Sequence, residues 1–302
     1  MIYNRYEEKS LRSWARQFTD KHPRLFDFLF RIVIKRTLNK LKKRDFPCLI
    51  ELETVNRCNN VCSFCPASKD NDIREFAKMD AGLFQRIIDD LQQSDYRGVL
   101  GLYSNNEPLL DERLADWAKT AKESLPKAHI VLFTNGTLLT PELFQRLIPY
   151  IDEMIIDNYS DSLKMIKPVS EVYDNCIKDT EYEKKVIIHI RKLNEVLNTH
   201  GGSAPNADPQ TAIIPKNTCL LPFAQCVIRP DGKISLCCND AYGKYTLGDL
   251  NKQSISEVWN GRPFNELRER LKKGRQSIDK CSVCDNRLMS ISYIRKGLRG
   301  ER

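Results

Sequence analysis

The chain has 302 residues, a formal net charge of +8 and 41% hydrophobic residues, a composition that supports one substantial globular core. Residues 1–46 hold 13 Lys and Arg against 5 Asp and Glu, which leaves 35 of each charge in the rest of the chain. Because this body is electrically balanced, an extended basic groove for nucleic acid is not expected.

Residues 23–44 are predicted to form a basic amphipathic helix that begins at Pro23. Its apolar stripe consists of Phe26, Leu29, Phe30, Val33, Leu38 and Leu41. Two interpretations stay open: the stripe packs on the protein body, or the segment from Leu25 to Leu41 rests on a membrane. In the second case basic side chains lie near anionic headgroups, namely Lys35, Arg36, Lys40, Lys42, Lys43 and Arg44.

No run of about 20 apolar residues and no secretory signal is found, so we expect a cytoplasmic protein. Peripheral attachment to the inner face of the membrane stays open. From residue 47 onward, strand-like runs alternate with helical ones. Strands are predicted at 49–54, 98–103, 129–135, 153–158 and 186–191, and helices at 80–93 and 112–125.

This alternation predicts a mainly parallel α/β sheet, and five visible units are too few for a closed eight-stranded barrel. We therefore expect a partial (β/α) barrel of about six strands. A Gly-, Pro- and Asn-rich stretch at 198–210 is predicted to be a linker or loop. The predicted domains are a basic N-terminal helical segment (1–46), the partial barrel (47–210) and a small C-terminal α+β module (211–302).

Eleven cysteines in a chain without an export signal favour metal or cluster ligation over disulfides. Cys58, Cys62 and Cys65 follow the first predicted strand at the spacing C-x3-C-x2-C. Three thiolates from one loop can ligate three irons of a cubane and leave the fourth iron open. A structural zinc site, the alternative, normally has four ligands in paired spacings.

These residues resemble the signature of the radical S-adenosylmethionine (SAM) superfamily, C-x3-C-x-aromatic-C, with Phe64 in the aromatic position near the adenine of SAM. The resemblance implies a [4Fe–4S] cluster whose open iron binds SAM. It also implies reductive cleavage of SAM to a 5′-deoxyadenosyl radical, with a flavodoxin- or ferredoxin-type protein as electron donor.

Further SAM contacts are implied by the same resemblance. The run from Ser104 to Pro108 stands where the family has Gly-Gly-Glu, with asparagines in place of the glycines. Residues after the later strands take the remaining positions. The implied SAM-binding set is Phe64, Asn106, Glu107, Asn135, Asn158, Ser160 and Arg191, with Tyr159 beside them.

The C-terminal segment contains VIRPDGKISLCC, which predicts a hairpin with its turn at 230–232. The pattern formed by Cys219, Gly232, Cys237 and the pair Cys281 and Cys284 resembles the auxiliary-cluster module called SPASM, or its shorter form called twitch. The resemblance implies one auxiliary [4Fe–4S] cluster with the ligands Cys219, Cys237, Cys281 and Cys284. A four-cysteine zinc ribbon remains the alternative, and the roles of Cys226 and Cys238 stay open.

Cys48 and Cys176 stand apart and are expected to be buried small hydrophobes. The resemblance implies a radical SAM oxidoreductase or epimerase acting on a carbohydrate or aminocyclitol carbon, with a lipid- or carrier-linked substrate also open. Alternatives are a peptide- or protein-modifying radical SAM enzyme, a zinc-stapled binding protein and a non-catalytic iron–sulfur electron carrier. No catalytic residue is assigned, because His189, His200 and Arg191 are candidates by position only.

Overall fold

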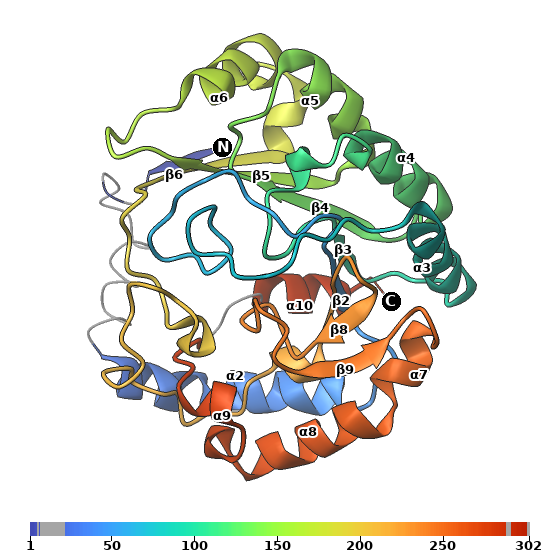
Figure 1. Cartoon of the computed structure of the whole chain (residues 1–302), viewed down its shortest axis with the longest axis vertical. Coiled ribbons are helices and arrows are strands. Elements are labelled where there is room, and N and C mark those ends of the chain that lie inside the picture. Colours follow the sequence, from blue (N-terminus) through green and yellow to red (C-terminus); the bar gives the residue numbers. More distant parts are fainter. Residues whose placement is uncertain (5, 7–21, 288–290, 301–302) are drawn as a thin grey trace.

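The computed structural model describes residues 1–4, 6, 22–287 and 291–300. In this part of the chain one nine-stranded sheet has the order β1-β6-β5-β4-β3-β2-β7-β8-β9 (Figure 1). The strands are β1 (Ile2–Asn4), β2 (Leu49–Leu52), β3 (Val99–Gly101), β4 (His129–Thr134), β5 (Glu153–Tyr159), β6 (Val186–Arg191), β7 (Gln225–Ile228), β8 (Lys233–Ser235) and β9 (Thr246–Asp249). All neighbours from β1 to β7 are parallel, whereas β7, β8 and β9 are antiparallel.

The five strands predicted from the sequence are β2 to β6, and the predicted partial (β/α) barrel is confirmed. The N-terminal segment was expected to be only helical, and that was incomplete. Its first residues form β1, which pairs with β6 in the register Ile2 to Ile188. Three residues carry too little periodicity to be recognised as a strand.

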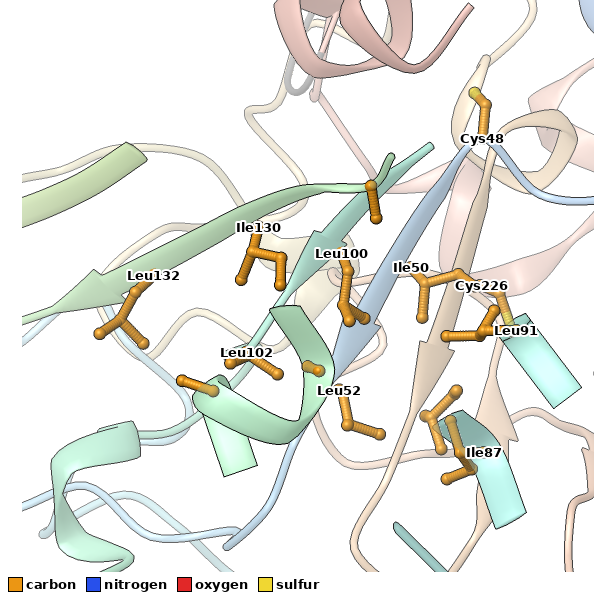
Figure 2. Close-up of a cluster of buried hydrophobic side chains, with 14 of the residues drawn as sticks. Cys48, Ile50, Leu52, Ile87, Leu91, Leu100, Leu102, Ile130, Leu132 and Cys226 are labelled. Atoms are coloured by element: carbon orange, nitrogen blue, oxygen red, sulfur yellow. The ribbon is translucent and has the colours of Figure 1, made fainter. Parts of the chain in front are cut away.

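Helices cover the outer face of the parallel sheet: α3 (Ala81–Gln93), α4 (Leu114–Ser124), α5 (Pro141–Leu147) and α6 (Lys167–Val172). Asp80 caps α3 by accepting hydrogen bonds from the backbone N–H groups of residues 82 and 83. Figure 2 shows Ile87 and Leu91 of α3 facing Ile50 on β2, and all three side chains are buried. This α3–sheet contact fixes β2, the strand that leads into the first cysteine loop.

The inner face of the sheet has its own small cluster, formed by Leu49, Val99, Val131 and Ile155. Helix α10 (Ile291–Gly297) packs against β2 and β3 on this side. The approach is close, since a Cβ atom on Gly297 would lie 2.2 Å from the carbonyl oxygen of residue 48. The end of the chain therefore closes the inside of the partial barrel.

The C-terminal module continues the same sheet, because β7 pairs in parallel with β2. The predicted hairpin is confirmed as β7 and β8, with Gly232 at φ +80° in the turn. Helices α7 (Ile255–Trp259), α8 (Arg262–Lys273) and α9 (Asp279–Ser282) follow, and Ser254 and Glu257 form a capping box at the start of α7.

Residues 198–210 form an irregular loop that is attached to the C-terminal module. The Thr199 hydroxyl donates to the carbonyl of residue 283 at 2.7 Å, and the Lys280 ammonium donates to the Ser203 hydroxyl at 2.7 Å. Because the sheet passes from β6 through β2 into β7, the domain boundaries at 46 and 210 stay a prediction.

Helix α2 (Pro23–Leu41) confirms most of the predicted N-terminal helix and packs on the C-terminal module. The Asp27 carboxylate accepts from the backbone N–H of Lys216 at 3.3 Å and lies 3.7 Å from the Arg287 guanidinium. Cys48 and Cys176 are buried, as expected. None of the described helices is long and apolar enough to cross a bilayer.

Candidate active site

A cavity of about 380 Å³ opens at the carboxyl ends of the parallel strands. Its wall contains Cys58, Cys62 and Cys65 from the loop after β2. Other parts of the wall come from elements far away in the sequence, including Cys238 and Tyr293. The carboxyl ends of parallel strands are the usual position of α/β active sites, and this volume is typical of small-molecule pockets.

The three cysteines of the first loop lie within electrostatic reach of one another. Burial raises the pKa of Cys58 to about 12. Burial, then the nearby thiols of Cys65 and Cys58, raise the pKa of Cys62. Burial makes the deprotonated form of these thiols unfavourable when no cation is nearby. Bound iron would stabilise the thiolates and so reverse this effect. The donor chemistry therefore fits a cluster at this position.

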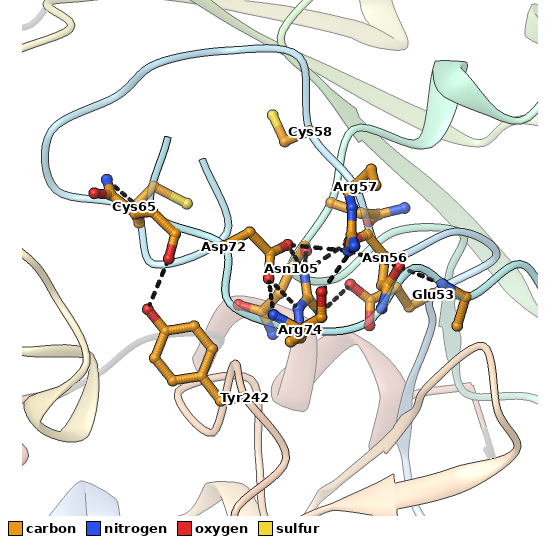
Figure 3. Close-up of polar contacts among 12 residues, drawn as sticks. Glu53, Asn56, Arg57, Cys58, Cys65, Asp72, Arg74, Asn105 and Tyr242 are labelled. Carbon is orange, nitrogen blue, oxygen red and sulfur yellow. Dashed lines mark hydrogen bonds and ion pairs between the residues drawn. The ribbon is translucent and has the colours of Figure 1, made fainter. Parts of the chain in front are cut away.

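Arg74 fixes the cysteine loop to the sheet, as Figure 3 shows. Its guanidinium contacts the Glu53 carboxylate just beyond β2 at 2.9 Å and the Asp72 carboxylate at 2.8 Å. It also donates to the carbonyl of Asn105, after β3, at 2.7 Å. From the C-terminal module, the Tyr242 hydroxyl donates to a carbonyl of the same loop at 3.4 Å. One buried cation thus connects two strand ends with the ligand loop.

Four of the predicted SAM-binding residues line the cavity: Phe64, Asn106, Glu107 and Asn135. Phe64 is 6% exposed, and its ring centroid lies 5.7 Å from that of Tyr159. The buried Nδ2 of Asn106 has no hydrogen-bond partner among the described residues. An orphaned donor in a cavity wall fits a ligand with acceptor oxygens, such as the carboxylate of SAM.

Glu107 is buried rather than a surface turn residue. Its carboxylate accepts from the Thr134 hydroxyl at 2.6 Å, the backbone N–H of Asn135 at 2.7 Å and the backbone N–H of Leu109 at 3.1 Å. Burial raises its pKa to about 7, although these hydrogen bonds act in the opposite direction. Glu107 therefore holds the ends of β3 and β4 together at the cavity.

The remaining three predicted SAM contacts lie outside the cavity wall in this structure. The fully buried Asn158 side chain bonds the backbone of residues 164 and 166 in the loop after β5. Ser160 bonds the Ser162 hydroxyl at 2.7 Å. Arg191 lies behind Phe64, 5.9 Å from its ring centroid, and pairs with Glu195 at 2.8 Å. In this structure the polar groups of all three residues contact the protein, and their assignment as SAM contacts stays a prediction.

Several residues of the cavity wall are not among those predicted from the sequence. Glu51 on β2 accepts from the Gln225 amide at 2.6 Å and from the Ser104 hydroxyl at 2.9 Å. Burial raises its pKa to about 7. On the other side of the cavity, Asp157 from β5 lies 2.9 Å from His189. The signal for Glu51 was present, since alternation in the strand 49–52 assigns it to the inner face.

Two further wall residues come from the C-terminal part of the chain. The Tyr293 hydroxyl donates to Glu153 at 2.8 Å, and Lys296 also contacts that carboxylate. His129, then Lys296 and Tyr293, lower the pKa of Glu153 to about 2 despite its burial. This ionised network anchors α10, so Tyr293 forms a fixed part of the cavity wall.

The second cysteine set brings together Cys219, Cys237, Cys281 and Cys284, three of them buried. Burial, followed by the other thiols of this set and Cys238, raises the pKa of Cys237 well above its usual range. Cys238 belongs to the cavity wall as well, and its backbone N–H donates to Gln225 at 3.2 Å.

Cys226 lies elsewhere, on β7 in the outer-face core (Figure 2). Burial raises its pKa to about 12, and Arg268 is the charged group that opposes this shift. Cys226 is therefore a core thiol.

Buried cations flank the second set. Arg275 is 4% exposed and donates to the carbonyl of Cys284 at 3.1 Å and to that of Asn217 at 3.2 Å. Lys280 is also buried. Four thiolates give an iron–sulfur cluster negative charge, and buried cations offset that charge in a low-dielectric site. The four thiols and two cations together fit an auxiliary cluster.

Within the described ranges, no three His, Cys, Asp or Glu side chains converge closely enough to hold a single metal ion. A cubane needs no such convergence, because each thiolate ligates a different iron. Comparison with known families agrees with the cluster interpretation. The family model described as "Radical SAM superfamily" matches residues 52–202, half of the chain. The chain belongs to the radical SAM superfamily.

A second family model, the SPASM model described as "Iron-sulfur cluster-binding domain", matches residues 219–285. The cofactors of this radical SAM protein are SAM, the SAM-binding [4Fe–4S] cluster and an auxiliary iron–sulfur cluster. The two alternatives from other classes, a zinc-stapled binding protein and a non-catalytic electron carrier, are wrong.

Two relatives resemble most of this radical SAM chain. The S-adenosyl-L-methionine-dependent 2-deoxy-scyllo-inosamine dehydrogenase of Niallia circulans is 28% identical over 240 residues, covering 79% of this chain and 92% of the relative. The crystal structure of BtrN in complex with AdoMet and 2-DOIA is 27% identical, with a TM-score of 0.67 over 80% of this chain and 94% of BtrN.

The open conformation of BtrN is 24% identical, with a TM-score of 0.59 over 81% of this chain and 94% of BtrN, and it shows the same fold. The predicted class, a radical SAM oxidoreductase, is confirmed.

Proposed function

We propose that this enzyme oxidises a secondary hydroxyl of a cyclitol or aminocyclitol to a ketone. One observation carries the proposal: the cavity that contains the cysteine triad also contains the buried carboxylate of Glu51. The likeness to a 2-deoxy-scyllo-inosamine dehydrogenase supports the substrate class. The peptide-modifying alternative has no comparable observation in its favour.

The oxidation removes a hydrogen atom from carbon, a proton from the hydroxyl and one further electron. When bound, SAM and the two clusters supply the radical that abstracts the hydrogen atom and the acceptor for that electron. The protein has to supply the base. Glu51 fits this role, because a buried carboxylate with a pKa near 7 is close to ideal for proton transfer at neutral pH.

Glu51 is also held in place for that role. Ser104 and Gln225 each donate to one of its oxygens, from β3's end and from β7. Each oxygen keeps a second lone pair with which to accept a substrate hydroxyl. The orientation of the carboxylate is therefore set before substrate binds.

Epimerisation is the second candidate, and the thiol of Cys238 in the cavity wall favours it. A thiol can return a hydrogen atom to a carbon radical: the S–H bond breaks, a C–H bond forms and a thiyl radical remains. To restore the thiol, the flavodoxin- or ferredoxin-type electron donor would supply one electron and water one proton. Reaction in D₂O distinguishes the two outcomes, because epimerisation places one deuterium on the product carbon and oxidation places none.

We also propose a flavodoxin- or ferredoxin-type protein as the electron donor, since each reductive cleavage of SAM consumes one electron. For helix α2 we propose peripheral contact with a membrane on the cytoplasmic side, because its apolar residues Leu25, Phe28, Leu29 and Ile32 are exposed. We propose two sets of cluster ligands: Cys58, Cys62 and Cys65 in the cavity wall, and Cys219, Cys237, Cys281 and Cys284 in the C-terminal module. Among the SAM contacts, we give priority to those that line the cavity, namely Phe64, Asn106, Glu107 and Asn135.

The proposed function is tested with protein purified and reconstituted without oxygen, using 2-deoxy-scyllo-inosamine as the probe. Two cubanes require about eight irons per chain. We expect one ketone formed for each 5′-deoxyadenosine. Changing Cys58, Cys62 and Cys65 together to Ala should remove about half of the iron and abolish 5′-deoxyadenosine formation.

Changing Cys281 and Cys284 to Ala should remove the other half and leave some uncoupled SAM cleavage. Unchanged iron content in this second variant would show that the auxiliary ligands are assigned wrongly. Efficient formation of 5′-deoxyadenosine without oxidation or epimerisation of any cyclitol tested would refute the proposed substrate class.

A further inference from the structure

Within the described residues, helix α2 has one buried face and, opposite it, one exposed apolar face. The first face contains the buried residues Asp27, Ile34, Thr37, Leu38 and Leu41. The second consists of Leu25, Phe28, Leu29 and Ile32, which are 44%, 71%, 57% and 62% exposed. Packing on the protein body and contact with a membrane are therefore not mutually exclusive, because the helix has a surface for each.

The four exposed residues form one stripe. Their spacing of three, four and seven residues puts them on a single side of an α-helix, roughly opposite the buried side. Single exposed apolar residues are ordinary, whereas a contiguous exposed stripe of large side chains marks a binding surface. We call this set the outer stripe of α2.

The outer stripe cannot simply rotate inward. On the buried side, the Asp27 backbone carbonyl accepts from the Asn217 amide at 2.8 Å, and the Asp27 carboxylate accepts from the backbone N–H of Lys216. The core residues Ile34, Leu38 and Leu41 hold the other half of the helix. The helix is therefore docked with the outer stripe facing away from the body.

Positive charge accompanies the outer stripe. Arg24, Arg31 and Lys35 are exposed along one flank, and Arg36 follows on the same side as the stripe itself. The single acidic residue of α2, Asp27, lies on the opposite, buried side. An apolar stripe bordered by Lys and Arg is typical of helices that lie in the plane of a membrane interface.

We propose that the outer stripe of α2 binds an anionic phospholipid surface. The apolar side chains enter the boundary between headgroups and acyl chains, and Arg24, Arg31, Lys35 and Arg36 contact lipid phosphates. Charge complementarity favours lipid over a second copy of this chain, because a twofold interface through this face would oppose the same cations to one another. This proposal does not depend on the identity of the cyclitol substrate.

Vesicle flotation with the full-length holoenzyme tests the proposal. Vesicles of phosphatidylcholine alone are compared with vesicles that also contain phosphatidylglycerol, at low and high salt. We expect flotation with the anionic vesicles, weaker flotation at high salt and none with phosphatidylcholine alone. Absence of flotation with either composition, or equal flotation with both, would overturn the proposal.

Two variants test the surface itself. Phe28→Gln combined with Ile32→Gln should reduce binding at least tenfold, whereas Ile73→Gln, at a residue 78% exposed outside α2, should leave it unchanged. Arg31→Gln combined with Lys35→Gln should reduce it about 30-fold, since each basic residue near an anionic surface contributes about a fivefold effect. Formation of 5′-deoxyadenosine should be unchanged in the α2 variants, which shows that they are folded.

Self-association provides the decisive alternative. If the holoenzyme dimerises without lipid and Phe28→Gln with Ile32→Gln abolishes the dimer, then a second copy covers the outer stripe and the lipid proposal is wrong. If sedimentation shows the same oligomeric state for both proteins while flotation differs, the lipid proposal is supported.

Discussion

Replacing Glu51 by Gln separates the proposed base from the radical machinery. The amide can still accept from Gln225 and place its N–H₂ against the Ser104 hydroxyl, so the hydrogen-bonded positions are retained. It cannot accept a proton. General base catalysis contributes about 10²- to 10⁴-fold, so ketone formation should fall by at least 100-fold. Formation of 5′-deoxyadenosine should persist and become uncoupled from product.

The pH dependence gives a second readout with a definite sign. Because Glu51 must be ionised to act as a base and its pKa is about 7, wild-type ketone formation should rise with pH through 7 and then level off. Glu53→Gln is the matched control. Glu53 is equally buried with a pKa of about 7, but it contacts Arg74 outside the cavity wall and should leave this profile unchanged.

Stability should move in the opposite direction to activity. The folded-state pKa of Glu51 lies above its unfolded value of 4.5, so the native protein loses stability as pH rises from 4.5 towards 7. At about 1.4 kcal/mol for each pKa unit, the penalty reaches roughly 3 kcal/mol above pH 7. Anaerobic thermal unfolding should therefore show Glu51→Gln to be more stable than wild type at pH 8. The difference in stability should become smaller towards pH 5. Wild-type ketone formation and an unchanged pH profile in Glu51→Gln would refute the proposed base.

Three other changes test separate parts of the site. Arg74→Met should destabilise the protein by about 3–5 kcal/mol, measured by unfolding, because it leaves buried carboxylates without their cation; a near-neutral effect would contradict this. Cys238→Ser should keep the full iron content, and loss of about half of the iron would instead make Cys238 a ligand. Gly297→Ala should lower the melting temperature, because its Cβ would lie 2.2 Å from the Cys48 carbonyl oxygen; an unchanged melting temperature would show that α10 can shift freely.

The strands and the first cysteine loop could be predicted because their signals are local. Apolar runs of β2 to β6 alternate with helical periodicity, and the triad spacing needs no tertiary information. The family resemblance assigned Phe64 and Asn135 to the SAM site, and both line the cavity. Asn158 and Arg191 had equally good positions, but the loop after β5 and the Glu195 carboxylate take up their polar groups. Sequence position specifies the strand end, whereas competition among neighbouring donors and acceptors decides which side chain stays available.

The far wall of the cavity could not be predicted from the sequence, for a different reason. Tyr293 and Cys238 line the same cavity as Glu51 only because elements distant in sequence become neighbours. Adjacent cysteines alternate along the chain, so the sequence could suggest that Cys238 points away from Cys237, but not what it faces. No local pattern reveals that α10 returns to the inside of the barrel.

The pairing of β2 with β7 explains why both cysteine sets keep a fixed relation. A partial barrel leaves an open edge at β2, and an open edge exposes unpaired backbone groups. Here β7 pairs with that edge in the register Ile50 to Cys226, and the Gln225 amide contacts the Glu51 carboxylate across it. The strand that completes the edge also leads into the hairpin that ends at Cys237. The SAM-binding loop, the proposed base and the auxiliary ligands are therefore attached to one hydrogen-bonded frame, and a substitution that weakens β2–β7 pairing should uncouple SAM cleavage from oxidation before it empties either cluster.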